Sequence, residues 1–180
     1  DFYSSRFLID KTIEFIDSNL ADGKPFFAYV PFQAVHLPVQ APQEYIDRYL
    51  GVYDAGWDAL REDRLTRAVE VGLLPGKVPM ARMDTTGDWD ALSDARKQYE
   101  SKRMAVYAGM IEAMDDNIGR LMTYLQAQGA LDNTIFVFTS DNGAEGSGPV
   151  DPLTGPNSLM TANMGYSTDY ETLGLKGSFS

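Results

Sequence analysis

Cysteine is absent from the 180-residue sequence, and histidine occurs once. Without cysteine, the chain can form neither a disulfide framework nor a cysteine-ligated zinc site. Basic residues are also scarce, since 15 lysines and arginines stand against 26 aspartates and glutamates, for a formal charge of -11. This balance argues against non-specific nucleic-acid binding and against binding to anionic membrane surfaces, because both need clustered positive charge. No apolar run approaches the length of a membrane span, so we expect none.

Hydrophobic residues nevertheless make up 44% of the chain and aromatic residues 12%. These fractions are ordinary for a globular protein, and 180 residues suffice for one domain with a sizeable core. The first residues already resemble the approach to a helix, and the last stop without a terminating signal. We therefore expect the chain to be an excerpt of a longer protein.

Apolar residues recur at helical spacing in four stretches. Ser4 or Ser5 would cap the first helix and Ser93 the last, and Gly23 and Gly129 would end them. The predicted helices span residues 4–20, 43–50, 57–71 and 94–128.

Two short apolar stretches, 25–31 and 134–139, predict strands. Residues 135–138 are apolar without alternation, which is typical of a strand buried on both faces. Strands separated by helices indicate an α/β fold with a mostly parallel sheet flanked by helices. Ligands bind beyond the carboxyl ends of such strands, which directs attention to the residues after Val30 and Ser140.

Asp141, Asn142 and Gly143 follow the second predicted strand after one residue, Ser140. Asn-Gly is a strong signal for a hairpin turn, but the glycine- and proline-bearing stretch that follows is a poor second strand. A carboxylate beside an amide carbonyl also offers two oxygen ligands that suit Ca²⁺ or Mg²⁺. The residue chemistry leaves both readings open, a plain turn and a metal site.

His36 and Lys176 are the other candidates for chemistry. His36 lies in a proline-bounded loop beyond the first predicted strand, where an imidazole could bind an anion or protonate a leaving group near neutral pH. Lys176 is flanked by Gly174 and Gly177, which would let the backbone approach a ligand closely. Most single histidines and lysines, however, are simply polar surface residues.

Four stretches, "PFFAYVPFQAVHLPVQAP", "YDAGWDALREDRL", "YAGMIEAMDDNIGRLMTYLQAQGALDNTIFVFTSDNG" and "LGLKGSFS", together resemble the sulfatase family. The resemblance is to its arylsulfatase branch, within the alkaline-phosphatase superfamily, and covers nearly the whole chain in the same order. It implies an alkaline-phosphatase-like α/β fold that is incomplete here. Residues 1–180 would then be the central part of one sulfatase catalytic domain, truncated at both ends.

The resemblance also implies a function, the hydrolysis of small-molecule sulfate esters. By matching position, Asp141 and Asn142 would be Ca²⁺ ligands. His36 would contact the sulfate or the leaving-group oxygen and Lys176 would bind the sulfate, both as catalytic and substrate-binding residues. The family's formylglycine, a modified Cys or Ser, would lie upstream of this chain, as would the aspartate pair that completes the calcium shell. The isolated chain is therefore expected to be inactive and poorly stable. A periplasmic or secreted location is common in the family.

Two alternatives stay open. One is a phosphoesterase or phosphonate hydrolase of the same superfamily, although the single histidine favours one calcium over two transition metals. The other is a truncated, non-catalytic domain that binds a metal or an anion. The sequence indicates no oligomeric state.

Overall fold

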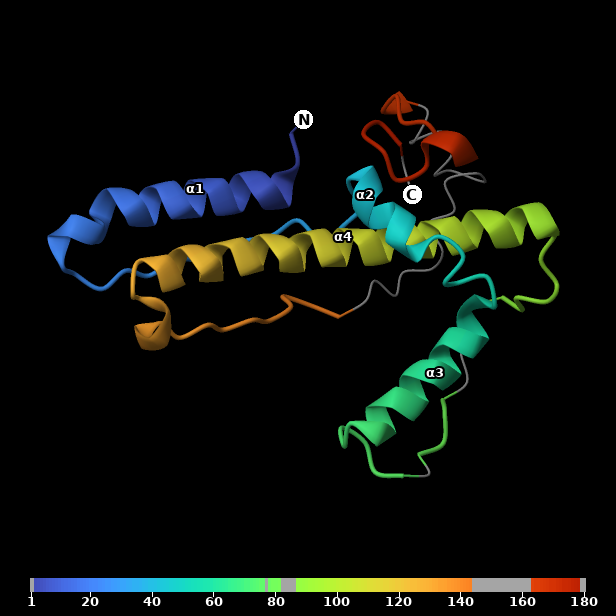
Figure 1. Ribbon diagram of the computed structural model, residues 1–180. Helices are drawn as coiled ribbons and strands as arrows, with labels where there is room; N and C mark the ends of the chain where they lie inside the picture. The colour runs from blue at the N-terminus through green and yellow to red at the C-terminus, as the bar shows by residue number, and fades with distance from the viewer. Residues whose placement is uncertain (1, 77, 82–86, 144–162, 179–180) are drawn as a thin grey trace.

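The computed structural model describes residues 2–76, 78–81, 87–143 and 163–178 (Figure 1). The four predicted helices are confirmed, with ends shifted by a few residues. Within the described ranges no strand is assigned, and the one bridge between extended residues joins Ser167 to Ser178. The described part of the chain also contains no helix with the length and apolarity that a membrane crossing requires. The α-helices are α1 (Ser4–Asn19), α2 (Gln43–Ile46), α3 (Gly56–Glu70) and α4 (Asp94–Ala127), and the 3₁₀ turns are η1 (Leu20–Asp22), η2 (Asp47–Tyr49), η3 (Leu131–Asn133) and η4 (Tyr170–Thr172).

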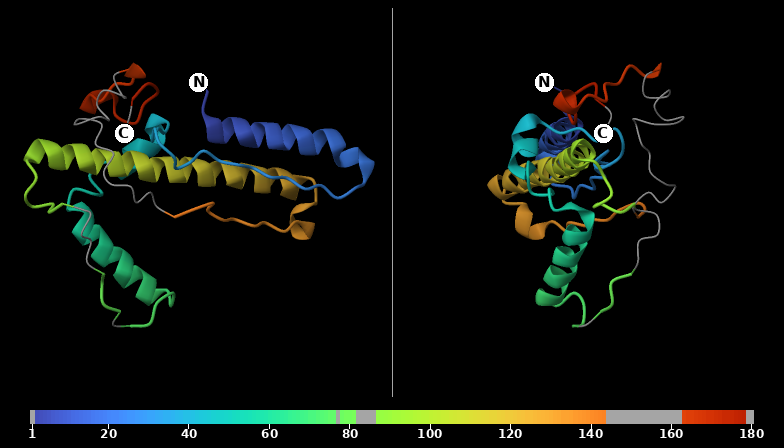
Figure 2. Two further views of the ribbon diagram at one scale, coloured as in Figure 1. Left: turned by 180° about the vertical axis from the view of Figure 1, so that it is seen from behind. Right: turned by 90° about the vertical axis from the view of Figure 1, so that its right-hand side faces the viewer.

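Helix α4 is the axis on which the other elements pack. It begins as predicted, because the Ser93 hydroxyl accepts a hydrogen bond from the Arg96 backbone N–H at 3.3 Å. Figures 1 and 2 show α1 alongside the second half of α4, running in the same direction. The two helices bury Ile9, Leu121 and Leu125 between them. This apolar cluster accounts for the helical periodicity of both stretches.

The start of α1 differs from the prediction that Ser4 or Ser5 caps it. Both serines lie inside the helix, and the N-cap is Tyr3, which makes no side-chain capping bond. The Ser5 side chain is buried, so it packs against the protein instead of serving the helix end.

Helix α2 crosses α4 near the middle of the longer helix. Ile46, on α2, is fully buried against Val106 and Met110 of α4. The crossing is close at Gly109, where an added Cβ would lie 3.0 Å from the backbone nitrogen of Ile46. Glycine in the middle of α4 therefore weakens the helix locally and allows α2 to approach.

Helix α3 projects away from α4 (Figure 1). It begins at Gly56, whose φ of 86° is left-handed, and an added Cβ there would overlap the Trp89 ring. Trp57 packs edge-on against the same ring, with ring centroids 4.8 Å apart. The two tryptophans thus fix the base of α3.

The two predicted strands run as extended chain along α4 but are not paired into a sheet (Figures 1 and 2). Phe27 is 92% exposed, Ile135 91% and Val137 84%. The prediction that residues 135–138 are buried on both faces is therefore wrong for this chain. A strand is buried when neighbouring strands and covering helices flank it, and the described residues place no strand beside either segment. The parallel sheet stays a prediction for the protein.

Candidate functional site

His36 lies in the loop of residues 32–42, called here the His36 loop. Its backbone N–H donates to the Gln33 carbonyl at 2.7 Å, and its ring Nδ1 lies 2.7 Å from the Leu37 carbonyl oxygen. Because a carbonyl only accepts, Nδ1 carries the proton of this hydrogen bond, and Nε2 is the nitrogen that remains for another partner. The side chain is exposed. The local backbone thus selects one tautomer of the ring.

Residues on either side of His36 anchor its loop. Val35, Leu37, Val39 and Ala41 join the apolar cluster that Ile46 forms with α4. His36 lies between two of these anchors and has its own side chain in solvent. The alternation places the imidazole at the surface of a packed loop; the sequence predicted an ordered loop here, but not which way the ring faces.

Lys176 lies in the loop of residues 174–178, called here the Lys176 loop. The flanking Gly174 and Gly177 have left-handed φ values of 87° and 89°, which favour glycine. Leu173 and Ser178 are buried at the two ends, and Lys176 is exposed between them. The preceding turn η4 is held to α4 by Lys102, whose Nζ donates to the Tyr170 carbonyl at 2.5 Å.

The structure brings the His36 and Lys176 loops together although 140 positions separate the two residues. The Ala41 N–H donates to the Gly174 carbonyl at 3.0 Å, and Gln40 Nε2 donates to the Ser178 carbonyl at 2.6 Å. Leu175 packs into the same apolar cluster as the anchors of the His36 loop. A positive side chain and the single imidazole therefore emerge from two loops that share one core.

Asp141 and Asn142 lie in an exposed bend at the end of the second extended segment. The Asn142 N–H donates to Asp141 Oδ1 at 3.0 Å, and Asn142 Nδ2 donates to the Gly143 carbonyl at 2.8 Å. The Ser140 hydroxyl donates to the Asn142 carbonyl. All these contacts are local, so the described residues show no hydrogen bond between this bend and either loop.

The metal prediction rests on a donor set that is chemically suitable but incomplete. Asp141 Oδ2 and the Asn142 amide oxygen are hard oxygen donors of the kind Ca²⁺ prefers. In the part of the chain that the structure describes, however, no three His, Cys, Asp or Glu residues gather as a metal-binding group. Calcium needs about six to eight oxygen ligands, so its remaining ligands would have to come from outside these residues.

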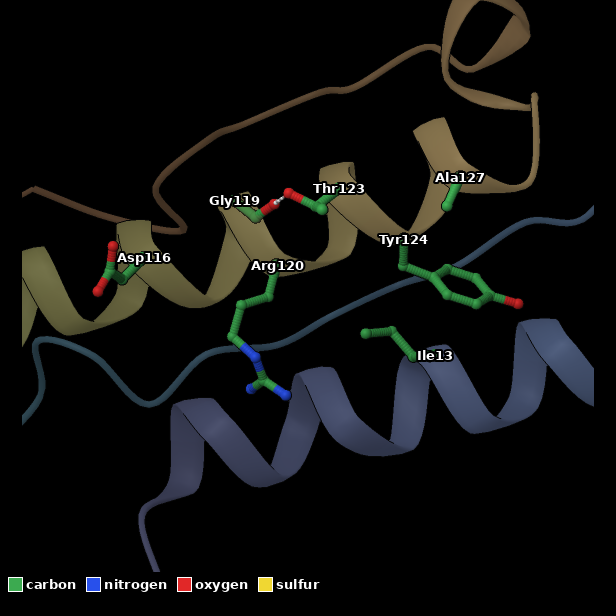
Figure 3. A pocket seen from close by; sticks show the side chains of 7 residues that line it. All are labelled: Ile13, Asp116, Gly119, Arg120, Thr123, Tyr124 and Ala127. Atoms are coloured by element: carbon green, nitrogen blue, oxygen red, sulfur yellow. Dashed lines mark hydrogen bonds between the residues drawn. The ribbon is translucent and has the colours of Figure 1, made fainter.

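A groove of about 610 Å³ opens elsewhere, between α1 and α4 (Figure 3). Arg120 crosses it and donates to Asp10 at 2.5 Å, and the Tyr124 hydroxyl donates to Asp17 at 2.9 Å. None of the predicted site residues lines this groove. Its polar groups connect the two helices, so the groove is part of the α1–α4 interface and has a structural role.

Sequence reasoning did not find the bonds between the two loops. Gln40 and Ser178 stand 138 positions apart, and neither residue type carries a local signal for such a pairing. The nearest signal is the pair of glycines around Lys176, which predicted a special backbone but not its partner.

Comparison with known proteins gives a consistent result across most of the chain. The sequence model of a family described as Sulfatase matches residues 1–171. A protein named as an uncharacterized sulfatase of Schizosaccharomyces pombe is 46% identical over 149 residues, covering 82% of this chain and 27% of that protein. An arylsulfatase of Klebsiella aerogenes is 34% identical over 181 residues, covering 99% of this chain and 38% of that protein.

A third relative has a broader name. The multifunctional alkaline phosphatase superfamily protein PehA of Trinickia caryophylli is 28% identical over 147 residues, covering 81% of this chain and 28% of that protein. The chain thus spans between about a quarter and two-fifths of the length of these relatives.

Proposed function

This chain belongs to the sulfatase family, and we propose that the protein is a sulfuric ester hydrolase of the arylsulfatase type. The single observation that carries the proposal is the joining of the His36 and Lys176 loops on one core. We further propose that residues 1–180 form the central part of one catalytic domain of alkaline-phosphatase-like α/β fold. Its sheet would be completed by strands outside this chain.

Lys176 is proposed to bind the sulfate group. Its ammonium stands on a loop that is fixed at both ends, so little ordering is needed when an anion arrives. A positioned cation stabilises the negative charge that builds up on the oxygens as the ester bond breaks. The large negative charge of the whole chain makes such local cations decisive for an anionic substrate.

His36 is proposed to supply a proton to the departing alcohol or phenol. The Leu37 carbonyl holds the proton on Nδ1, so the protonated ring presents its second N–H at Nε2. An imidazolium held in this way can act as a general acid towards a leaving oxygen. The same N–H could bind the ester oxygen before it leaves.

Asp141 and Asn142 are proposed as part of a Ca²⁺ site, because their oxygens fit a hard cation. When bound, the ion would neutralise charge on the sulfate oxygens. A formylglycine in the rest of the protein would supply the nucleophile. A periplasmic or secreted location is proposed from the family alone.

The decisive experiment measures turnover of an aryl sulfate and of the matching aryl phosphate by the full-length protein. Lys176→Ala should lower kcat/KM for the sulfate by about 10²–10³-fold, the usual effect of removing one charge-stabilising group. Lys11→Ala is the matched control, because Lys11 is an exposed lysine paired with Glu14 within α1. It should leave turnover unchanged.

Three outcomes would contradict the proposal in different ways. Full activity of Lys176→Ala would remove its assigned role. Preference for the phosphate ester would favour a phosphoesterase, and no turnover of either ester would favour a non-catalytic domain.

A separate measurement tests the metal. Asp141→Ala should lose bound calcium, as measured by elemental analysis after dialysis, whereas Asp132→Ala should retain it. Asp132 is an exposed aspartate of η3, just before the second extended segment begins. Equal calcium content in both variants would remove Asp141 from the ligand set.

A further inference from the structure

We propose that Gln40 and Ser178 are positioning residues that hold the Lys176 ammonium where a substrate anion must meet it. The inference rests on the proposed function, since it assigns Lys176 to the sulfate. Neither residue needs to touch the substrate. They act by fixing the backbone from which Lys176 extends.

The hydroxyl of Ser178 closes the Lys176 loop from inside. It accepts the Gly174 N–H at 2.9 Å and donates to the Leu175 carbonyl at 2.7 Å. The Ser178 backbone N–H also donates to the Leu175 carbonyl, at 2.9 Å. The side chain is fully buried. One hydroxyl therefore ties the two ends of a five-residue loop and leaves Lys176 at its exposed part.

Gln40 attaches this closed loop to the His36 loop. Its Nε2 donates to the Ser178 carbonyl at 2.6 Å, while the neighbouring Ala41 N–H donates to the Gly174 carbonyl at 3.0 Å. The two bonds reach the first and last residues of the Lys176 loop from adjacent positions. Two attachment points fix both the place and the orientation of the loop, which a single bond would not.

The apolar core formed by α2 and α4 holds the Lys176 loop from a third side. A Cβ added to Gly174 would lie 2.3 Å from Val106 Cγ2 and 3.0 Å from Ile46 Cδ1. The base of the Lys176 loop is thus seated directly on the apolar core, without space to slide. The hydrogen bond from Gln40 is the attachment that a substitution can remove without disturbing this core, because the Gln40 side chain is only partly buried.

The test uses the full-length protein and a double-mutant cycle. Gln40→Met keeps the side-chain length but removes the donor, and should lower kcat/KM for an aryl sulfate by about 10–100-fold, as small misplacements of a binding group do. It should also raise the inhibition constant of inorganic sulfate. Gln43→Met is the control, because Gln43 is exposed and its amide donates to Asp47, the first residue of η2, away from the Lys176 loop. It should change neither value.

The cycle separates positioning from mere stabilisation. In a Lys176→Ala background, Gln40→Met should have less than about a twofold further effect, because the group it positions is gone. The same 10–100-fold loss in both backgrounds would overturn the proposal. If Gln40→Met fails to fold, Gln40→Asn serves instead, since it keeps the amide and shortens the reach by one methylene.

Hydrogen exchange gives a readout that does not need activity. Gln40→Met should speed amide exchange in peptides covering residues 173–178 by about tenfold relative to Gln43→Met. If the wild-type protein hydrolyses sulfate esters but Gln40→Met exchanges these amides no faster than Gln43→Met, the inference is overturned and the proposed function is not. A wild-type protein without sulfatase activity would overturn the proposed function, and faster exchange would then still establish the attachment of the loop.

Discussion

Helices α1 and α2 and the two extended segments all carry apolar residues, yet the helices bury one apolar face against α4, whereas the segments leave most of their apolar side chains exposed. Ile46 of α2 is fully buried, whereas Ile135 of the second segment is 91% exposed. A helix makes its backbone hydrogen bonds within itself and needs one covered face. A strand needs neighbours both for its hydrogen bonds and for its faces. The difference separates the elements whose apolar faces are covered within the described residues from those whose apolar faces are not.

The largest effect expected from this comparison comes from truncating the two isoleucines in the full-length protein. Ile46→Ala should lower the free energy of unfolding by about 3 kcal/mol, since it leaves a cavity against α4. Ile135→Ala should cost a similar amount if the sheet forms around it. Urea unfolding of both variants measures the pair. A cost below about 0.5 kcal/mol for Ile135→Ala would mean that the segment stays exposed and that no sheet covers it.

A smaller effect, of opposite sign at two positions, tests the α2–α4 crossing. Gly109→Ala should destabilise the protein by about 1 kcal/mol, because the gain in helix propensity is outweighed by displacement of the α2 backbone. Gly119→Ala, on the same helix with nothing within 4 Å of the added Cβ, should stabilise by about 1 kcal/mol. Thermal unfolding compares the two. Equal shifts of the same sign would show that α2 does not press on Gly109.

The smallest effect concerns the loss of stability at high pH that Tyr45, at the same α2–α4 crossing, should cause. Partial burial, and then the hydrogen bond to Asp116, raise the pKa of Tyr45 to about 12. The folded protein therefore keeps this phenolic proton better than the unfolded chain does. The resulting stability is present below about pH 10 and is lost as the pH rises towards about 12. Tyr45→Phe should lower the free energy of unfolding at neutral pH by less than about 1 kcal/mol, and the melting temperature should fall slightly with it.

The check is the difference in melting temperature between wild type and Tyr45→Phe as the pH rises. The difference should shrink between about pH 10 and about pH 12. A constant difference across that range would show that Tyr45 does not titrate differently in the two states.

The features that could be predicted from the sequence are the local ones. Ser93 was recognisable as a cap because a cap acts within one helical turn, and the structure confirms its bond to Arg96. Ser4 and Ser5 carry the same signal, but both lie inside α1, where Ser5 is buried by packing, and the N-cap is Tyr3. Capping residues in the sequence predict where a helix begins to within a few residues, and tertiary packing decides which of those residues is the cap.

The candidate site shows the same division. His36 and Lys176 could be singled out from residue type, flanking glycines and prolines, and the family resemblance. That their loops share a core became visible only in the structure, through Gln40, Ser178 and Ala41. The placing of Asp141 and Asn142 beside these loops stays a prediction, because their described contacts are all local.

Residue order and composition were enough to predict the helices, the extended segments, the excess of acid over base and the family. Which apolar faces are covered and which loops meet could be seen only in the folded chain, because both depend on contacts between residues far apart in the sequence. Gln40 and Ser178, with 138 positions between them and 2.6 Å between their bonded atoms, are the clearest case. The order of residues along the chain does not reveal this pairing, because the two residues meet only when the helices have packed.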